Sequence, residues 1–153
     1  MRIFSHCHSK ESSGWLGDFV KRFKVKLNQE SANPCIFAAK IEPMYTVIKR
    51  LEISAAHHLC LSYPSKCTNL HGHNWIVTIY CRAKELNEDG MVTDFSHIKQ
   101  LVKDRLDHKN LNEVLPFNPT AENIARWVCE QVPHCFKVEV QESEGNTAIY
   151  EKD

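Results

Sequence analysis

The sequence predicts an α+β fold in which a four-stranded, mainly antiparallel sheet carries two helices on one face. Two segments that are rich in β-branched residues and alternate in polarity come first. Two segments with apolar residues at steps of three and four follow, and two more alternating segments come last. The order strand, strand, helix, helix, strand, strand predicts this layered arrangement. Because an open sheet has exposed edges, we expect another subunit to cover them.

Composition narrows the classes of partner. The chain of 153 residues is long enough for one domain, and its 19 basic and 19 acidic residues cancel. No net charge draws it to nucleic acid or a membrane surface, so the expected partner is a small molecule or another protein. There is no apolar run of about 18 residues and no secretory leader pattern, which predicts no membrane span. Seven irregularly spaced cysteines argue against a disulfide framework and favour the reducing cytoplasm.

Residues 1–43 show neither a helical nor a strand periodicity. We expect them to form an N-terminal extension that is either poorly ordered or the product of a misassigned start. The first strong strand signal follows Met44. Residues 44–153 are therefore predicted to form the working domain.

The first strand is expected at residues 45–56, which are rich in β-branched residues and alternate in polarity. The residues of its apolar face are Leu51, Ile53 and Ala55. Side chains along a strand alternate between its two faces, so His57 continues this apolar face.

The second strand is expected at residues 71–83, and its apolar face is the one that carries His71 and His73. The loop at residues 59–69 leads into this strand. It delivers Cys67 next to the two histidines.

The first helix is expected to begin at Asp94 or Ser96, since either residue is a suitable N-cap. Its apolar residues recur at helical spacing and are Ile98, Leu101, Val102 and Leu106. The pattern ends near Asp107 and His108, and a polar connection follows.

The second helix is expected to begin at Thr120, with Glu122 in the first turn, where a carboxylate interacts favourably with the helix dipole. Its buried stripe is Ile124, Trp127 and Val128. Two strands follow, at residues 136–142 and near 148–152, joined by a tight turn. The inward face of the third strand is predicted to carry Phe136, Val138, Val140 and Glu142.

His57, His71 and His73 share the inward face of the two predicted strands. A neutral imidazole on an apolar face needs a partner, and a divalent metal is a suitable one. Three histidines with an open fourth position are typical of catalytic zinc. The alternative is a set of core histidines that are satisfied by hydrogen bonds.

Two interpretations of Cys67 remain open. Near a divalent cation the pKa of its thiol would fall towards neutrality, which suits a nucleophile or a base. As a fourth zinc ligand it would instead close the site and make the domain a non-catalytic, zinc-binding assembly module. The spacing of the sequence alone does not decide between them.

Two further candidates carry carboxylates. Asp107 could fix the tautomer of His108 and raise its basicity, provided that the chain turns between them, although a histidine also suits a helix C-terminus. Glu142 could accept hydrogen bonds from two adjacent N–H groups of a planar heterocycle. The alternative for Glu142 is an exposed residue at a strand end.

The motifs occur in the order expected for a known family. They are Ser54-Ala55-Ala56-His57, Cys67 followed by Leu70-His71-Gly72-His73, Gly90-Met91-Val92 with Asp94-Phe95, Leu106-Asp107-His108 with Leu111-Asn112, Pro119-Thr120-Ala121-Glu122-Asn123, and Glu142. From about Met44 onwards the chain resembles the 6-pyruvoyltetrahydropterin synthase and 6-carboxytetrahydropterin synthase family.

The resemblance implies a tunnelling fold, in which the sheets of several subunits join into a barrel. The expected assembly is a homohexamer of two trimers, with active sites between subunits. The resemblance also implies that Zn²⁺ is bound by His57, His71 and His73. The catalytic residues would be Cys67, Asp107 and His108. Glu142 would anchor the pterin, and Thr120 and Glu122 would approach it from a neighbouring subunit.

The implied substrate is 7,8-dihydroneopterin triphosphate. In its short domain and the compact loop between His57 and Cys67 the chain resembles bacterial members of the family. This resemblance favours the branch that forms 6-carboxytetrahydropterin, releases acetaldehyde and triphosphate, and feeds queuosine biosynthesis. The branch that forms the 6-pyruvoyl product keeps the same catalytic residues and is the main alternative. A zinc hydrolase is a weaker one, because no H-E-x-x-H helix occurs.

Overall fold

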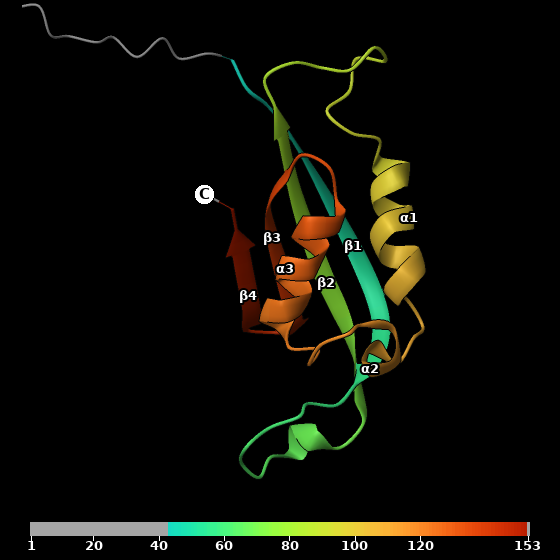
Figure 1. The fold of residues 1–153 in the computed structure, drawn as a ribbon, viewed down its shortest axis with the longest axis vertical. Coiled ribbons are helices and arrows are strands. Elements are labelled where there is room, and N and C mark those ends of the chain that lie inside the picture. Colours follow the sequence, from blue (N-terminus) through green and yellow to red (C-terminus); the bar gives the residue numbers. More distant parts are fainter. Residues whose placement is uncertain (1–42, 153) are drawn as a thin grey trace, which may run out of the picture. The chain divides into compact units, whose positions relative to one another are not determined.

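The computed structural model describes residues 43–152. The prediction of an N-terminal extension concerns a segment that, apart from Pro43, lies outside the described residues. The described part is a four-stranded antiparallel sheet with helices on one face (Figure 1), which confirms the predicted α+β class. In chain order the elements are β1 (Tyr45–His57), the 3₁₀ turn η1 (Lys66–Thr68), β2 (His71–Ala83), α1 (Phe95–Leu106), α2 (Leu111–Val114), α3 (Ala121–Gln131), β3 (Cys135–Ser143) and β4 (Asn146–Glu151).

The strands lie side by side in the order β1-β2-β3-β4, and the helices α1 to α3 lie in the connection between β2 and β3. The pairing of β1 with β2 runs without interruption from Tyr45 opposite Ala83 to His57 opposite His71. The pairing of β2 with β3 begins only at Ile76, so the first residues of β2 extend beyond β3. The histidine end of the β1–β2 pair therefore projects past the rest of the sheet.

The helix boundaries follow from capping. Asp94 is the N-cap of α1, since its carboxylate accepts the Ser96 N–H at 2.6 Å. Thr120 caps α3 as predicted and accepts the Asn123 N–H at 3.3 Å. The four-residue helix α2 lies where the sequence indicated only a polar connection, because one turn is too short to show a periodic pattern.

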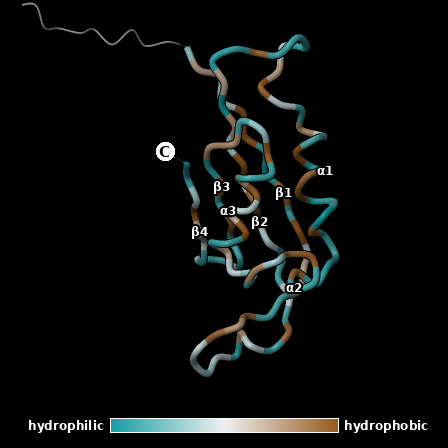
Figure 2. Tube along the Cα trace, in the orientation of Figure 1, coloured by the Kyte–Doolittle hydropathy of each residue, from teal (hydrophilic) through white to brown (hydrophobic). Residues whose placement is uncertain are grey.

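Apolar side chains of α1 and α3 pack on the inner face of the sheet, and Figure 2 shows apolar and polar positions alternating along these elements. The main buried residues are Ile98, Val102, Leu106, Ile124, Val128, Ile53, Val77, Ile79, Val138 and Val140. Cys81 and Cys129 are fully buried and behave as small core residues. Trp127 is only partly buried, and the Arg105 guanidinium lies 5.1 Å from its ring. None of the helices in residues 43–152 is long and apolar enough to cross a membrane.

The prediction that Phe136 faces the core is wrong, because β3 contains a bulge. Cys81 pairs with Cys135 and Tyr80 pairs with Lys137, which leaves Phe136 as the extra residue. Its ring lies 6.3 Å from that of Tyr80, on the other face of the sheet. Cys135 takes the core position instead and is 5% exposed. Strict alternation cannot reveal such an inserted residue.

The Leu106→Ala variant tests the packing of α1. Leu106 is 2% exposed, so we expect its truncation to lower the free energy of unfolding by about 2–5 kcal/mol. Leu86→Ala is the matched control, because Leu86 is 38% exposed and should cost less than about 0.5 kcal/mol. Chemical denaturation measures both. Equal losses would contradict the assignment of Leu106 to the core.

Candidate active site

Three histidine rings meet where β1 ends and β2 begins. His57 pairs directly with His71 across the two strands, and His73 pairs with Ala55 two positions further along. The ring centroids are 4.6 Å apart for His57 and His71, and 4.9 Å apart for His71 and His73. One potential ligand atom from each of the three residues lies within 4.8 Å of the others. The structure thus brings the three predicted ligands together as a group that is able to hold a metal ion.

Backbone carbonyls orient two of these rings. His57 Nδ1 lies 2.8 Å from the Pro119 carbonyl oxygen, and His71 Nδ1 lies 2.7 Å from that of Asn69. A carbonyl can only accept, so each Nδ1 carries a proton, and in a neutral ring the lone pair that can bind a metal is then on Nε2. Such contacts typically orient metal-binding histidines. The roles of Asn69 and Pro119 were not predicted from the sequence, since a backbone carbonyl leaves no residue-type signal.

The residues present fit a metal ion. His57 is fully buried, and the Nε2 atoms of His57 and His73 have no hydrogen-bond partner among the described residues. A buried nitrogen without a partner is costly, and a cation would satisfy both atoms. Burial lowers the pKa of His57, although the hydrogen bond to Pro119 opposes this shift. The lowered pKa favours the neutral form of the ring, which is the form that binds metals. Three neutral imidazoles are a donor set suited to zinc.

Glu142 points towards the same place from β3. Its Oε1 atom lies 3.5 Å from His57 Nε2 and 3.8 Å from His73 Nε2. These distances are too long for hydrogen bonds, and the Glu142 side chain remains 28% exposed. The carboxylate therefore stays available to a ligand beside the histidine group.

Cys67 lies on η1, in the loop between β1 and β2. Its N–H donates to Ser65 Oγ at 3.2 Å, and its carbonyl accepts the Leu59 N–H at 2.8 Å. Its thiol is half-buried and is not part of the metal-binding group found in the described chain. Among the described residues, the group that is able to hold a metal ion therefore consists of the three histidines without Cys67.

Asp107 and His108 lie at the C-terminal end of α1. His108 has a φ of 57°, which provides the turn that adjacent side chains need in order to meet. His108 Nε2 lies 3.8 Å from Asp107 Oδ2, and the His108 side chain is 82% exposed. Within residues 43–152 no hydrogen bond or ion pair joins Cys67 to either residue. The described chain therefore brings the histidines and Glu142 together, whereas it shows no hydrogen bond or ion pair between Cys67 and Asp107 or His108.

Asp107 also has a structural contact. Its carboxylate accepts the Ser54 N–H at 2.9 Å, which ties the end of α1 to β1. Burial raises the pKa of Asp107, but the Ser54 hydrogen bond and the charges of Lys103 and His108 outweigh it, and the pKa is lowered.

The lowered pKa of Asp107 predicts a pH-dependent contribution to stability. A carboxyl group whose pKa is lower in the folded state stabilises it above the unfolded pKa of about 3.9. That contribution disappears as the pH falls through the folded value. We expect the difference in unfolding free energy between the wild type and Asp107→Asn to be largest near pH 6 and to shrink below pH 4. A difference that is constant from pH 6 to pH 3, measured by urea denaturation, would contradict this assignment.

Two hollows meet at Glu142. The first has a volume of about 860 Å³, and its lining includes His73, His108, Lys109, Asn74 and Ser143. The second has a volume of about 590 Å³, and its lining includes Leu59, Tyr63, Thr120, Glu122 and Ala148. Thr120 and Glu122 thus share a hollow with Glu142 of their own chain.

The comparisons with known proteins agree with this architecture. The model of the family described as 6-pyruvoyl tetrahydropterin synthase matches residues 46–153. A relative from Synechocystis sp. called 6-carboxy-5,6,7,8-tetrahydropterin synthase is 37% identical, over 70% of this chain and 93% of its own. A protein of the same name from Bacillus subtilis is 30% identical, and the match covers 67% of this chain and 82% of that protein. The structure of Caenorhabditis elegans 6-pyruvoyl tetrahydropterin synthase superposes with a TM-score of 0.60 at 29% identity, over 72% of this chain and 97% of that one.

The fold and the site define a tunnelling-fold protein with a three-histidine group that is able to hold a metal ion, which confirms the predicted fold. The Synechocystis and Bacillus relatives are both called 6-carboxy-5,6,7,8-tetrahydropterin synthase. The chain belongs to the 6-pyruvoyl tetrahydropterin synthase family.

Proposed function

We propose that the protein is a zinc-dependent 6-carboxy-5,6,7,8-tetrahydropterin synthase of the cytoplasm. It would convert 7,8-dihydroneopterin triphosphate to 6-carboxytetrahydropterin, releasing acetaldehyde and triphosphate, in queuosine biosynthesis. The choice of product rests on the similarity to the Synechocystis protein of that name, since the match covers 93% of that protein. The family match to residues 46–153 supports the predicted working domain at residues 44–153.

The histidine group and Glu142 would bind different partners, namely the metal ion and the pterin ring. His57, His71 and His73 would hold zinc, which supplies Lewis-acid polarisation of the oxygens on the substrate side chain. Glu142 would accept hydrogen bonds from two N–H groups of the pterin ring, because its carboxylate has no hydrogen bond to any residue from 43 to 152. Thr120 and Glu122 would approach the pterin of a neighbouring subunit, and they also border a hollow with Glu142 of their own chain.

Proton transfer requires Cys67 and His108. The Cys67 thiolate would act as the base on the substrate side chain, and His108 would return protons while triphosphate leaves. Asp107 would fix the tautomer of His108, because its Oδ2 atom lies 3.8 Å from His108 Nε2.

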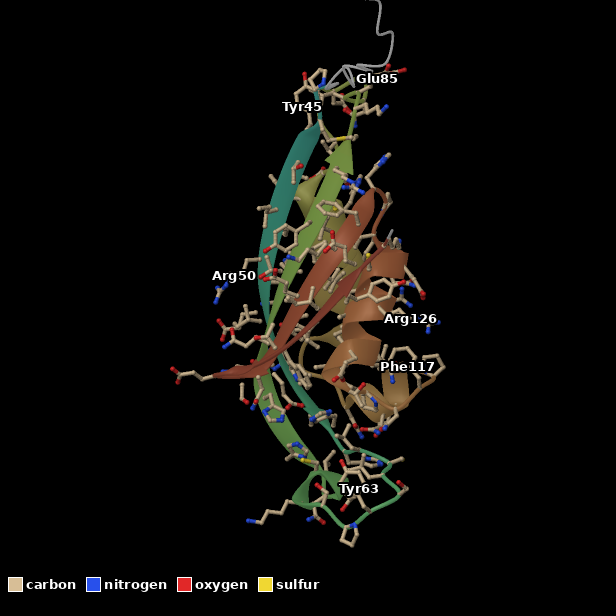
Figure 3. All side chains as sticks on the ribbon, turned by 90° about the vertical axis from the view of Figure 1, so that its left-hand side faces the viewer. Tyr45, Arg50, Tyr63, Glu85, Phe117 and Arg126 are labelled. Atoms are coloured by element: carbon tan, nitrogen blue, oxygen red, sulfur yellow. The ribbon has the colours of Figure 1, made fainter. Side chains whose placement is uncertain are left out.

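The distribution of these residues supports an active site between subunits. His108 is 82% exposed, and within the described chain it forms no hydrogen bond or ion pair with Cys67. We expect Asp107 and His108 of one copy to meet Cys67 of another in a homohexamer of two trimers. Both sheet edges, β1 and β4, lack a neighbouring strand within the described chain. The helix-free face, on which Arg50 lies in Figure 3, also carries Ile48, which is 54% exposed.

Product analysis tests the proposal. Zinc-loaded protein is incubated with 7,8-dihydroneopterin triphosphate, and the pterins and acetaldehyde are identified by mass spectrometry. A 6-carboxy product together with acetaldehyde is the expected result. Intact substrate in the presence of bound zinc would contradict it and favour the non-catalytic assembly module.

The second candidate is 6-pyruvoyltetrahydropterin synthase activity, in which triphosphate is eliminated and the side chain is not cleaved. The observation that favours it is the similarity to the C. elegans enzyme of that name at 29% identity. A pyruvoyl product without acetaldehyde in the same assay would select this candidate.

Glu142→Gln tests the binding role of this carboxylate. The amide replaces one acceptor oxygen by a donor, so it cannot accept two N–H bonds from a planar ring. We expect KM for the pterin to rise by about 10-fold or more, with zinc still bound. Steady-state kinetics and the zinc content measure the two effects. Loss of zinc with unchanged KM would instead make Glu142 a metal ligand.

A further inference from the structure

The segment at residues 58–60 leaves the sheet after His57, yet its backbone is bonded on two sides. On one side the Leu59 N–H donates to the Cys67 carbonyl at 2.8 Å. On the other side lie the side chains of two asparagines, Asn112 and Asn118, in and just after α2. The segment is therefore held like a strand between two neighbours, although it belongs to no strand.

Each asparagine bonds both polar groups of one residue. Asn112 accepts the His58 N–H at 2.8 Å through Oδ1 and donates to the His58 carbonyl at 2.9 Å through Nδ2. Asn118 does the same to Cys60, at 3.0 Å and 3.1 Å. Side-chain amides thus replace the neighbouring strand at alternate residues, while Leu59 faces the Cys67 loop.

The two asparagines are themselves fixed to the body of the domain. Asn112 lies on α2 beside Leu111, which is 1% exposed. The Asn118 carbonyl accepts the side-chain N–H of Asn123 on α3 at 3.0 Å. The carbonyl of Pro119, the next residue, bonds the His57 ring. The same connection between α2 and α3 therefore orients a candidate metal ligand and holds the loop that carries Cys67.

We infer that Asn112 and Asn118 are positioning residues for the Cys67 thiol, an inference that rests on the proposed function. By holding His58 and Cys60, they keep the Leu59 N–H aligned with the Cys67 carbonyl. This sets the distance between the thiol and the histidine group. A displacement of about 1 Å in a reacting group can cost on the order of 100-fold in rate. Neither asparagine needs to contact the substrate to exert this effect.

Hydrogen exchange at the Leu59 amide tests the inference directly, because neither asparagine bonds that amide. We expect Asn118→Ala to speed its exchange at least about 10-fold relative to the Ile79 amide of β2, which reports global unfolding. Asn112→Ala should act in the same direction. Asn87→Ala is the matched control, since Asn87 also bridges two backbone N–H groups, at 3.1 Å and 2.8 Å, at the other end of the sheet. A Leu59 amide as protected in both variants as in the control would overturn the inference.

Kinetics give the second readout. We expect kcat of Asn118→Ala to fall by about 10- to 100-fold with KM nearly unchanged, and zinc to stay bound. Asn118→Asp keeps the acceptor for the Cys60 N–H and should recover part of the rate. A change in KM alone would overturn the positioning role. A wild-type protein that is inactive on pterins would contradict the proposed function, while the exchange result would still decide whether the asparagines hold the loop.

Discussion

Replacing Cys67 by alanine is expected to abolish most of the turnover while zinc remains bound. The thiol lies outside the histidine group, so its loss should leave the metal site intact. Removing a side chain that transfers a proton typically costs about 100- to 10,000-fold in rate. Single-turnover assays and the zinc content of purified Cys67→Ala measure the two effects separately.

Cys60→Ala is the matched control for Cys67→Ala. Cys60 lies in the same loop, its thiol is exposed, and Asn118 holds only its backbone. We therefore expect Cys60→Ala to retain the wild-type rate. Wild-type turnover in Cys67→Ala, or a loss of its zinc, would contradict the proposed role of Cys67.

Replacing His73 by alanine is expected to remove the metal and the activity together. Loss of a hydrogen-bond partner of a metal ligand typically weakens metal binding by about 10- to 100-fold. Loss of one of three ligands should have a larger effect, so we expect zinc to bind at least about 100-fold more weakly. Competition with a chromophoric chelator measures the affinity. His73 is a better choice than His57, which is fully buried and contributes to the core. His97→Ala, on the exposed face of α1, is the control. Wild-type zinc affinity in His73→Ala would contradict the site.

Alternation of side chains was enough to predict that the three histidines share one face. The uninterrupted pairing of β1 with β2 then places His57 directly opposite His71. The sequence could not supply this register, because the loop between the two strands is too long to fix it by turn geometry. The bulge at Phe136 escaped prediction for a related reason, since one inserted residue resets the alternation.

The contacts around the site were harder to predict than its residue types. The Asp107 carboxylate bonds the Ser54 backbone, and the His57 ring bonds the Pro119 carbonyl. Both bonds join distant parts of the chain through backbone groups, which every residue has. The relation of Cys67 to His108 is a further case, because no hydrogen bond or ion pair joins them within the described residues of one chain. Sequence spacing along one chain carries no information about a contact between copies.

X-ray absorption at the zinc edge of the loaded protein tests whether three histidines hold zinc with an open fourth position. We expect three nitrogen ligands and one further light atom at about 2.0–2.1 Å, with no sulfur, in both the wild type and Cys67→Ala. A sulfur ligand at about 2.3 Å that disappears in Cys67→Ala would contradict it. That result would make Cys67 the fourth ligand and the site a closed, structural one.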